Sequence, residues 1–301
     1  YGEMAELIAH CLMQGGPAVV PLLKAGFDPA GGREMVRRVE ILTGLDTDNT
    51  WFVTQLDTAQ KEVREALIHA LGRHSENAPL LRDLVKAEKG RARKAALWSL
   101  AQMEDAETVA FWTKEIAKNP QSILYLTSAG SEWAADLTAA QLEALLHTFD
   151  GRDGVTPKEQ EQLEAVLSAM AGKCSARLLD AWRTLADRLS RLTRLRTADG
   201  KALTVSAGQY GTVSLDERAA DILLTSMAVT GDARLRALAQ ELYAAFGAPW
   251  LTPAVTADIL AKPADAVFTA YSPCFVRSGL LRRETEQEAQ LREQVLSALG
   301  H

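Results

Sequence analysis

A helical pattern that recurs after 29 residues constrains this chain more than any other feature of its sequence. The segments KEVREALIHALGRH, residues 61–74, and RARKAALWSLAQME, residues 91–104, place small or apolar side chains at matching positions. The matched pairs are Val63 and Ala92, Ala66 and Ala95, Leu67 and Ala96, Ala70 and Ser99, and Leu71 and Leu100. At about 100° per residue, these positions form one stripe along a helix. Each segment therefore predicts a helix with a single face in a core.

Two further segments carry the same pattern. ARLRALAQELYAAFG, residues 233–247, repeats it closely, and EMVRRVEILTG, residues 34–44, repeats it more loosely. A second apolar segment precedes each copy, and these segments are PAVVPLLKAGFD, NTWFVTQLDTA, APLLRDLVKAEK and DERAADILLTSMAVTG. A helix pair of this size cannot bury its apolar faces alone, so the sequence predicts that each pair stacks on its neighbours.

These helix pairs resemble HEAT repeats, in particular the short HEAT-like type of phycobilisome-lyase-related proteins. That type has the signature Asp-x-x-(Val/Leu)-Arg at the start of the second helix, and residues 232–236 match it in full. The other copies keep the arginine, as Arg37, Arg64 and Arg93, and replace the aspartate by Arg33, Gln60 and Lys89. The resemblance covers residues 16–105 and 214–247. It implies an α-solenoid, in which the family's ladder of Asp and Arg contacts between repeats is not expected throughout.

The expected fold is all-α, a right-handed α-α superhelix of the HEAT-like or armadillo type. Of the 301 residues, 47% are hydrophobic, and the prevalence of Ala and Leu favours helices packed through small side chains. We expect N-terminal HEAT-like repeats in residues 1–150 and further helical repeats in residues 151–301, joined at FDGRDG into one continuous solenoid. The amphipathic start at Tyr1, without a methionine, suggests a fragment of a longer protein.

Capping signals predict where the remaining helices begin. Capping-box spacing is found at Thr138 with Gln141, Thr156 with Glu159, and Ser214 with Glu217, and helix starts are also expected at Asn77 and Thr252, each close before a proline. The predicted helices are 138–149, 156–172, 174–196, 214–230, 232–246 and 252–261. A last helix, near 280–299, is expected to cap the stack.

One segment, TADGKALTVSAGQYGTVS at residues 197–214, interrupts the helical pattern. It has an Asp199-Gly200 turn signal followed by a run of residues that favour β-structure. We expect a short β-hairpin or a long loop insertion near residues 197–213. Leu203 and Val205 should pack on the adjoining helices, and Tyr210 should be exposed at the tip.

Composition and spacing disfavour several classes of function. A formal charge of −6 and a pI near 5.5 argue against a nucleic-acid binder that depends on a global positive field. The three cysteines, Cys11, Cys174 and Cys274, lie far apart, so neither a disulfide framework nor a zinc site is expected and the reducing cytoplasm fits. No apolar run is long enough for a transmembrane helix.

Catalytic and cofactor motifs do not stand out either. The five histidines form no i, i+4 pair with an acidic partner, and no G-x-S-x-G or phosphate-binding glycine loop is present. We therefore expect no metal, no cofactor and no catalytic residues.

Charge is strongly segregated between two adjacent segments. Residues 132–164 contain eight acidic and two basic side chains, whereas residues 173–201 contain eight basic and three acidic ones. Arg188, Arg191 and Arg194 should form a ridge beside a leucine stripe on one helix. Two interpretations remain open: a solvated helix face that the acidic segment neutralises, or a surface for an anionic partner. Trp98 is a second candidate, either as packing between repeats or as an anchor for a partner.

A non-enzymatic scaffold that binds a protein or peptide on its curved face is the leading functional hypothesis. The candidate partner-binding residues are Arg188, Arg191, Arg194, Arg196, Lys201, Tyr210 and Trp98. The alternative is a nucleic-acid binder, similar to HEAT-like DNA glycosylases, that uses the basic ridge at 177–201. A chromophore-lyase role, suggested only by the repeat subtype, comes last. No membrane partner is expected.

Overall fold

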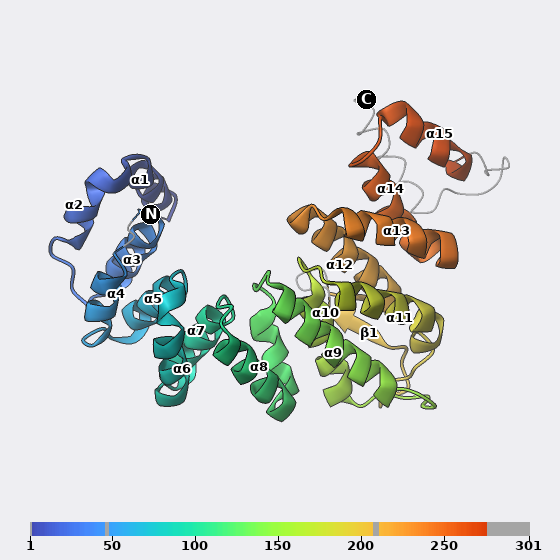
Figure 1. The fold of residues 1–301 in the computed structure, drawn as a ribbon, viewed down its shortest axis with the longest axis horizontal. Coiled ribbons are helices and arrows are strands. Elements are labelled where there is room, and N and C mark those ends of the chain that lie inside the picture. The colour runs from blue at the N-terminus through green and yellow to red at the C-terminus, as the bar shows by residue number, and fades with distance from the viewer. Residues whose placement is uncertain (1, 46–47, 207–210, 276–301) are drawn as a thin grey trace. The chain divides into compact units, whose positions relative to one another are not determined.

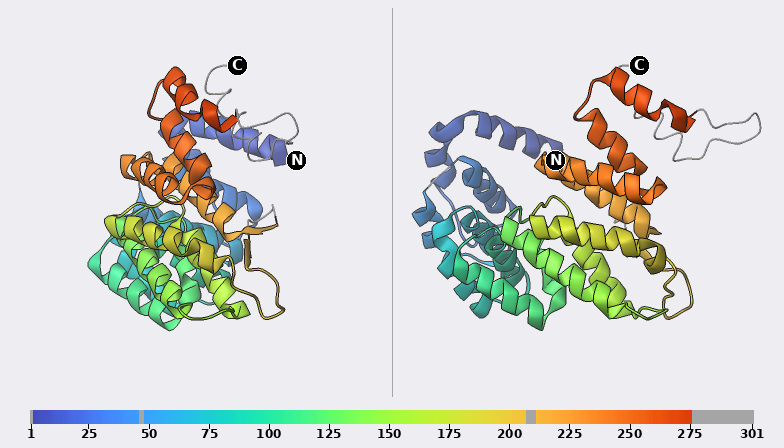
Figure 2. Two further views of the ribbon diagram at one scale, coloured as in Figure 1. Left: turned by 90° about the vertical axis from the view of Figure 1, so that its right-hand side faces the viewer. Right: turned by 45° about the vertical axis from the view of Figure 1, so that its right-hand side comes forward.

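The computed structural model describes residues 2–45, 48–206 and 211–275 (Figure 1). The chain divides into two compact units, Tyr1–Asn119 and Pro120–His301. Within each unit the described residues are predominantly helical, and consecutive helices pack on one another, as the colour sequence in Figure 2 also shows. The expected all-α fold of stacked helix pairs is confirmed.

The first unit begins with α1 (Gly2–Gln14), a 3-10 turn (Gly16–Val19) and α2 (Val20–Lys24). It continues with α3 (Arg33–Leu45), α4 (Asn49–Leu56), α5 (Lys61–Leu71), a 3-10 turn (Ser75–Asn77), α6 (Ala78–Ala87), α7 (Gly90–Leu100) and α8 (Ala106–Lys118). The helices α3, α5 and α7 pack side by side in that order, and α2, α4 and α6 each pack on the helix that follows (Figure 1). This row of α3, α5 and α7 contains the second helix of each predicted pair in the first unit.

The 29-residue pattern corresponds to the buried face of this row. Val63, Leu67 and Leu71 of α5 are completely buried, and Ala96 and Leu100 occupy the matching buried positions of α7. The side chains at these positions differ in size, because Ala96 of α7 stands where α5 has Leu67. Both helices nevertheless bury the same face. The predicted periodicity is confirmed.

The second unit has a longer set of helices. It comprises η3 (Pro120–Leu126), α9 (Glu132–Thr148), α10 (Pro157–Met170), α11 (Ala176–Leu192), β1 (Thr204–Ser206), β2 (Thr212–Ser214), α12 (Leu215–Thr230), α13 (Ala233–Phe246), η5 (Ala248–Trp250), α14 (Leu251–Ile259) and α15 (Ala264–Phe275). The helices α9, α11 and α13 form one row, while α10, α12 and α14 form the other. The buried rings of Trp182 and Trp250 pack edge to face in the core, with 6.1 Å between their centroids. FDGRDG, residues 149–154, connects α9 to α10 inside this unit.

Two of the three predicted capping boxes are present. Thr156 with Glu159 caps α10, and Ser214 with Glu217 caps α12, each through reciprocal side-chain and backbone hydrogen bonds. The prediction at Thr138 was wrong, because α9 begins at Glu132 and Thr138 is buried within it. Its hydroxyl donates to the carbonyl of Ala134 at 2.7 Å, a mid-helix bond that sequence spacing does not distinguish from a cap. The helix predicted near 280–299 lies outside the described residues.

The insertion contains two chain reversals where one hairpin was predicted. Asp199 and Gly200 form a tight turn, with Gly200 at φ +79°, that closes only a single bridge between Arg196 and Ala202. The strand pair comes afterwards, with Thr204 opposite Ser214 and Ser206 opposite Thr212. The predicted hairpin therefore exists, but the Asp199-Gly200 turn does not connect its strands. Tyr210 lies outside the described residues.

The hairpin is held by the helices on which it packs. Leu203 and Val205 are buried as predicted, and β1 contacts α10 and α12. On the outer edge of β1, the Gln160 amide donates to the Thr204 carbonyl at 2.8 Å, and the Ser206 amide donates to Glu164 at 3.2 Å. Since an isolated two-stranded hairpin is marginally stable, this covering by α10 accounts for its persistence.

Among the described helices, no single one has both the length and the apolar character needed to span a bilayer. Two short helical segments, 6–14 and 16–24, meet that criterion only when taken together, and they are bent by 117° at their junction.

Candidate functional site

The arginine that recurs in each repeat of the first unit connects three helices. Arg64 of α5 donates to the carbonyl of Leu56 at the end of α4 and, at 2.6 Å, to Glu88 at the end of α6. Arg93 of α7 repeats the arrangement, with 3.2 Å to the carbonyl of Val85 and 3.9 Å to Glu115 of α8. Both arginines thus satisfy a helix-end carbonyl that has no partner within its own helix. Their role is to hold the stack together.

The first and last copies of the pattern differ from this arrangement. The corresponding arginine of α3 is Arg38, which donates to the carbonyls of Leu23 and Ala25, so the sequence alignment to Arg37 was one residue out. In α13, Asp232 caps the helix and pairs with Arg234 at 2.7 Å on the same turn. The one complete family signature therefore makes a local ion pair between neighbouring side chains.

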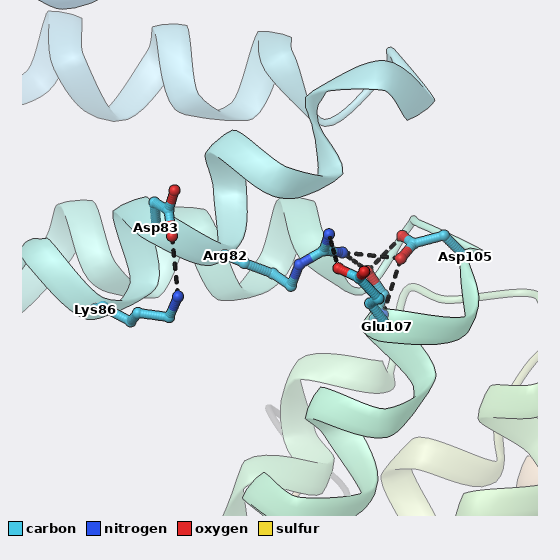
Figure 3. Close-up of polar contacts among 6 residues, drawn as sticks. Arg82, Asp83, Lys86, Asp105 and Glu107 are labelled. Atoms are coloured by element: carbon cyan, nitrogen blue, oxygen red, sulfur yellow. Dashed lines mark hydrogen bonds and ion pairs between the residues drawn. The ribbon is translucent and has the colours of Figure 1, made fainter.

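A further connection joins α6 to α8, as Figure 3 shows. Arg82 reaches the N-terminus of α8, where it contacts Asp105 at 2.8 Å and Glu107 at 2.6 Å. Asp105 is also the N-cap of α8, where the partial positive charge of the helix N-terminus favours a carboxylate. Arg82 adds a full positive charge beside the same carboxylate. On α6 itself, Lys86 and Asp83 form an exposed ion pair at 2.9 Å.

Trp98 is half-buried on α7. It occupies the repeat position that His69, an exposed residue, holds in α5. The structure thus places Trp98 partly at the surface of the α3, α5 and α7 row, and partly against its neighbours.

The basic ridge of the second unit is largely engaged within the chain. All four arginines of α11 contact carboxylates. Arg177 pairs with Glu143 at 2.7 Å, and Arg183 pairs with Glu241 at 2.7 Å and with Asp180 at 2.8 Å. Arg188 and Arg191 both pair with Asp150 at 3.0 Å. The partners Glu143 and Asp150 belong to the acidic segment that precedes α11. The structure therefore shows how two segments of opposite charge neutralise each other.

Asp150 is the most connected of these carboxylates. Arg188 also donates to the carbonyl of Leu146 at 3.0 Å, and Arg191 donates to the carbonyl of Phe149, so both arginines close the end of α9. Desolvation opposes ionisation of Asp150, but the hydrogen bond from Arg191 and the charge of Arg188 leave its pKa below the ordinary value. Asp150 is thus held as a carboxylate by these arginines.

The remaining ridge residues lie in and before the insertion. Arg194 and Arg196 are exposed, and neither side chain has a hydrogen bond or ion pair within the described ranges. The backbone of Arg196 bonds to Asp153 and Val155, which fixes the insertion against the 149–154 connection. Lys201 pairs with Asp199 at 2.6 Å on the turn, and this contact raises the pKa of Lys201.

An open groove of about 600 Å³ lies between the start of α10 and the insertion. Its lining includes Pro157, Gln160, Asp199, Lys201, Thr204 and Thr212. The lining mixes polar side chains with the apolar Pro157, Ala198 and Ala202. Of the polar residues, Gln160, Asp199 and Lys201 already bond within the chain. The groove therefore offers few groups that are available to orient a ligand.

The chemistry-bearing side chains elsewhere are dispersed. Over the described part of the chain, no three His, Cys, Asp or Glu side chains gather where they could hold a metal ion. Burial and an interaction with Asp232 raise the pKa of the Cys174 thiol to about 11, so it is not an activated nucleophile. Sequence reasoning missed Lys173, which is fully buried and donates to the carbonyls of Thr127 and Ala171 at 3.2 and 3.5 Å. No sequence pattern distinguishes it from an exposed lysine.

Comparison with known proteins agrees with this geometry. A family model described as HEAT repeats matches residues 49–128, which include α4 to α8 and the arginines Arg64 and Arg93. No curated protein matches the chain significantly. The stacked pairs, their repeated arginines and the matching family model together identify HEAT repeats in residues 49–128.

Proposed function

We propose that this chain is a non-enzymatic scaffold that binds a protein or peptide on the exposed face of the α3, α5 and α7 row. The observation that carries the proposal is the HEAT-repeat match at residues 49–128, together with Trp98 on the surface of that row. HEAT repeats commonly mediate protein interactions, and stacked repeats present long continuous surfaces for that purpose. Tryptophan is enriched among residues that dominate binding energy. The three separated cysteines support the cytoplasm as the compartment.

Site-specific photo-crosslinking tests this proposal. A photoreactive phenylalanine analogue, which keeps an aromatic ring at the site, replaces Trp98 in one variant and Asp83, exposed on α6, in a control variant. We expect a discrete protein adduct in extracts of the native source from position 98 and none from position 83. Equal labelling at both positions, or no adduct at position 98, would contradict the proposal.

Nucleic-acid binding through residues 177–201 receives less support. All four arginines of α11 contact intrachain carboxylates, and Arg194 and Arg196 alone leave their charge available on this ridge. Binding to a phosphate backbone requires several available cations and weakens steeply with salt. Titration with duplex DNA at low ionic strength distinguishes the two functions, because the scaffold is expected to show no salt-dependent binding.

A further inference from the structure

One face of α7 combines two exposed cations with a half-buried tryptophan. Arg91, Lys94 and Trp98 follow each other at i, i+3 and i+7, so they lie on a single stripe of the helix. The rest of the circumference is packed, since Ala95, Ala96, Leu97, Ser99 and Leu100 are buried. The α7 stripe, defined as Arg91, Lys94 and Trp98, is thus the surface that α7 presents outward.

The two cations of the α7 stripe are not used in holding the stack. Arg91 and Lys94 are exposed, and neither has a hydrogen bond or ion pair to any residue that the structure describes. Arg93, which lies between them in sequence, instead reaches Val85 and Glu115 on the packed side. The cationic character of the stripe is therefore separate from the repeat's structural arginine.

The equivalent stripe on α5 has the opposite charge. At the positions of Arg91, Lys94 and Trp98, α5 carries Glu62, Glu65 and His69. A long polyanion that followed the row would meet these carboxylates next to the α7 cations, and the chain as a whole carries a formal charge of −6. A short anionic segment confined to α7 would avoid this repulsion.

We propose that the α7 stripe binds a short acidic peptide segment with one large apolar side chain, an inference that rests on the proposed scaffold function. The apolar side chain packs on the Trp98 ring, and two carboxylates pair with Lys94 and Arg91. At about 1.5 Å per residue, the stripe from residue 91 to 98 is about 10 Å long. An extended peptide covers that length with about three to four residues. The partner sequence thus has two acidic residues within four positions of an aromatic or large aliphatic residue.

Fluorescence anisotropy with the full chain tests this inference. The probe is a fluorescein-labelled peptide with the core Glu-Asp-Ser-Phe between Gly-Ser flanks, and the control peptides replace Phe by Ser or both acids by Lys. We expect saturable binding of the first peptide and at least about tenfold weaker binding of each control. Absence of saturable binding by the first peptide would overturn the inference.

Two variants and a matched control assign the binding to the α7 stripe. The double variant R91E/K94E changes only exposed side chains and should weaken binding at least about tenfold, as should W98A. K86E, a charge reversal at an exposed lysine of α6, should bind within about twofold of the unaltered chain (Figure 3). Equal affinities of R91E/K94E and the unaltered chain would overturn the inference even if W98A perturbs folding.

The outcomes also separate this inference from the function on which it rests. If position 98 crosslinks a protein while the acidic peptide does not bind, the scaffold function stands and the acidic specificity is wrong. If a single-stranded 12-residue oligonucleotide displaces the peptide through the same three residues at equal concentration, the partner class is wrong. If position 98 crosslinks no protein, the scaffold function itself fails.

Discussion

The two units of this molecule use arginine in different ways. In the first unit, Arg64 lies between three helices, and the side chains of Arg64 and Glu88 are only 25% and 19% exposed. In the second unit, Arg183 connects α11 to α13 across the surface, and its side chain and that of Glu241 are 43% and 49% exposed. Ion pairs that water screens contribute little to stability, whereas a half-buried pair leaves unsatisfied groups when one partner is removed. The Arg64–Glu88 pair should therefore contribute more to the free energy of unfolding than the Arg183–Glu241 pair.

Two little-exposed cations, one from each unit, differ as well. Arg64 is paired with a carboxylate, whereas the partners of Lys173 among the residues that the structure describes are backbone carbonyls alone. A carbonyl satisfies a donor but carries no full negative charge, so the desolvation of the ammonium is not offset by an ion pair. The regular unit thus pairs its inner cation, and the unit with the insertion does not.

The largest expected effect concerns Lys173. Burial lowers its pKa from the ordinary value of 10.5 to about 8. Between these pH values the unfolded chain binds more protons than the folded chain, so stability should rise as the pH increases from 8 to 10.5. The rise attributable to Lys173 is on the order of 2–3 kcal/mol, and urea unfolding across this pH range measures it.

Lys173→Met isolates this contribution, because all other titrating groups remain. The difference in stability between the variant and the unaltered chain should change across the interval, whereas Lys94→Met, at an exposed lysine, should leave it constant. A parallel pH dependence of Lys173→Met and the unaltered chain would show that the buried lysine is not penalised.

A second prediction compares the two arginine classes directly. Arg64→Ala removes the donor to Leu56 and leaves Glu88 half-buried without its cation, so we expect a loss of about 2 kcal/mol in unfolding free energy. Arg183→Ala removes exposed contacts to Glu241 and Asp180, and the expected loss is about 0.5 kcal/mol. Urea denaturation of both variants gives the comparison. Equal losses would mean that burial does not separate the two classes.

The sequence predicted the repeat architecture because the apolar period alone decides which faces must be buried. The pattern around Val63 and Leu67 could have been satisfied only by stacked helices, and the capping boxes at Thr156 and Ser214 act within a single turn. Thr138 failed for the opposite reason, because its hydroxyl has two possible backbone partners and tertiary burial decided between them.

The candidate site was less predictable, since it depends on contacts between segments far apart in sequence. Arg188 and Arg191 have the same helical spacing whether they face a partner or Asp150, and only the position of the 149–154 connection determines which. The same limit applies to Arg91 and Arg93. They are two residues apart, and the packing of α6 and α8 makes one structural and leaves the other exposed.

The smallest expected effect on stability concerns the left-handed backbone conformation at the first residue of α5 and of α7. Lys61 at the start of α5 has φ +44°, and the equivalent residue of α7, 29 positions later, is Gly90 at φ +57°. A left-handed backbone conformation costs a side-chain-bearing residue about 1 kcal/mol, whereas glycine adopts it readily. Lys61→Gly should therefore stabilise the chain by up to about 1 kcal/mol, and Gly90→Ala should destabilise it by about the same amount.

Thermal unfolding of both variants measures these changes, with Gly130→Ala as the matched control. An added Cβ meets no atom within 4 Å at either Gly90 or Gly130, and only Gly90 has the positive φ, so steric contacts do not contribute to the difference. Gly130→Ala should stay within about 0.5 kcal/mol of the unaltered chain. If Lys61→Gly destabilises the chain, then the Lys61 side chain contributes more to this helix start than its backbone conformation costs, and the two repeats are less equivalent than their shared pattern indicates.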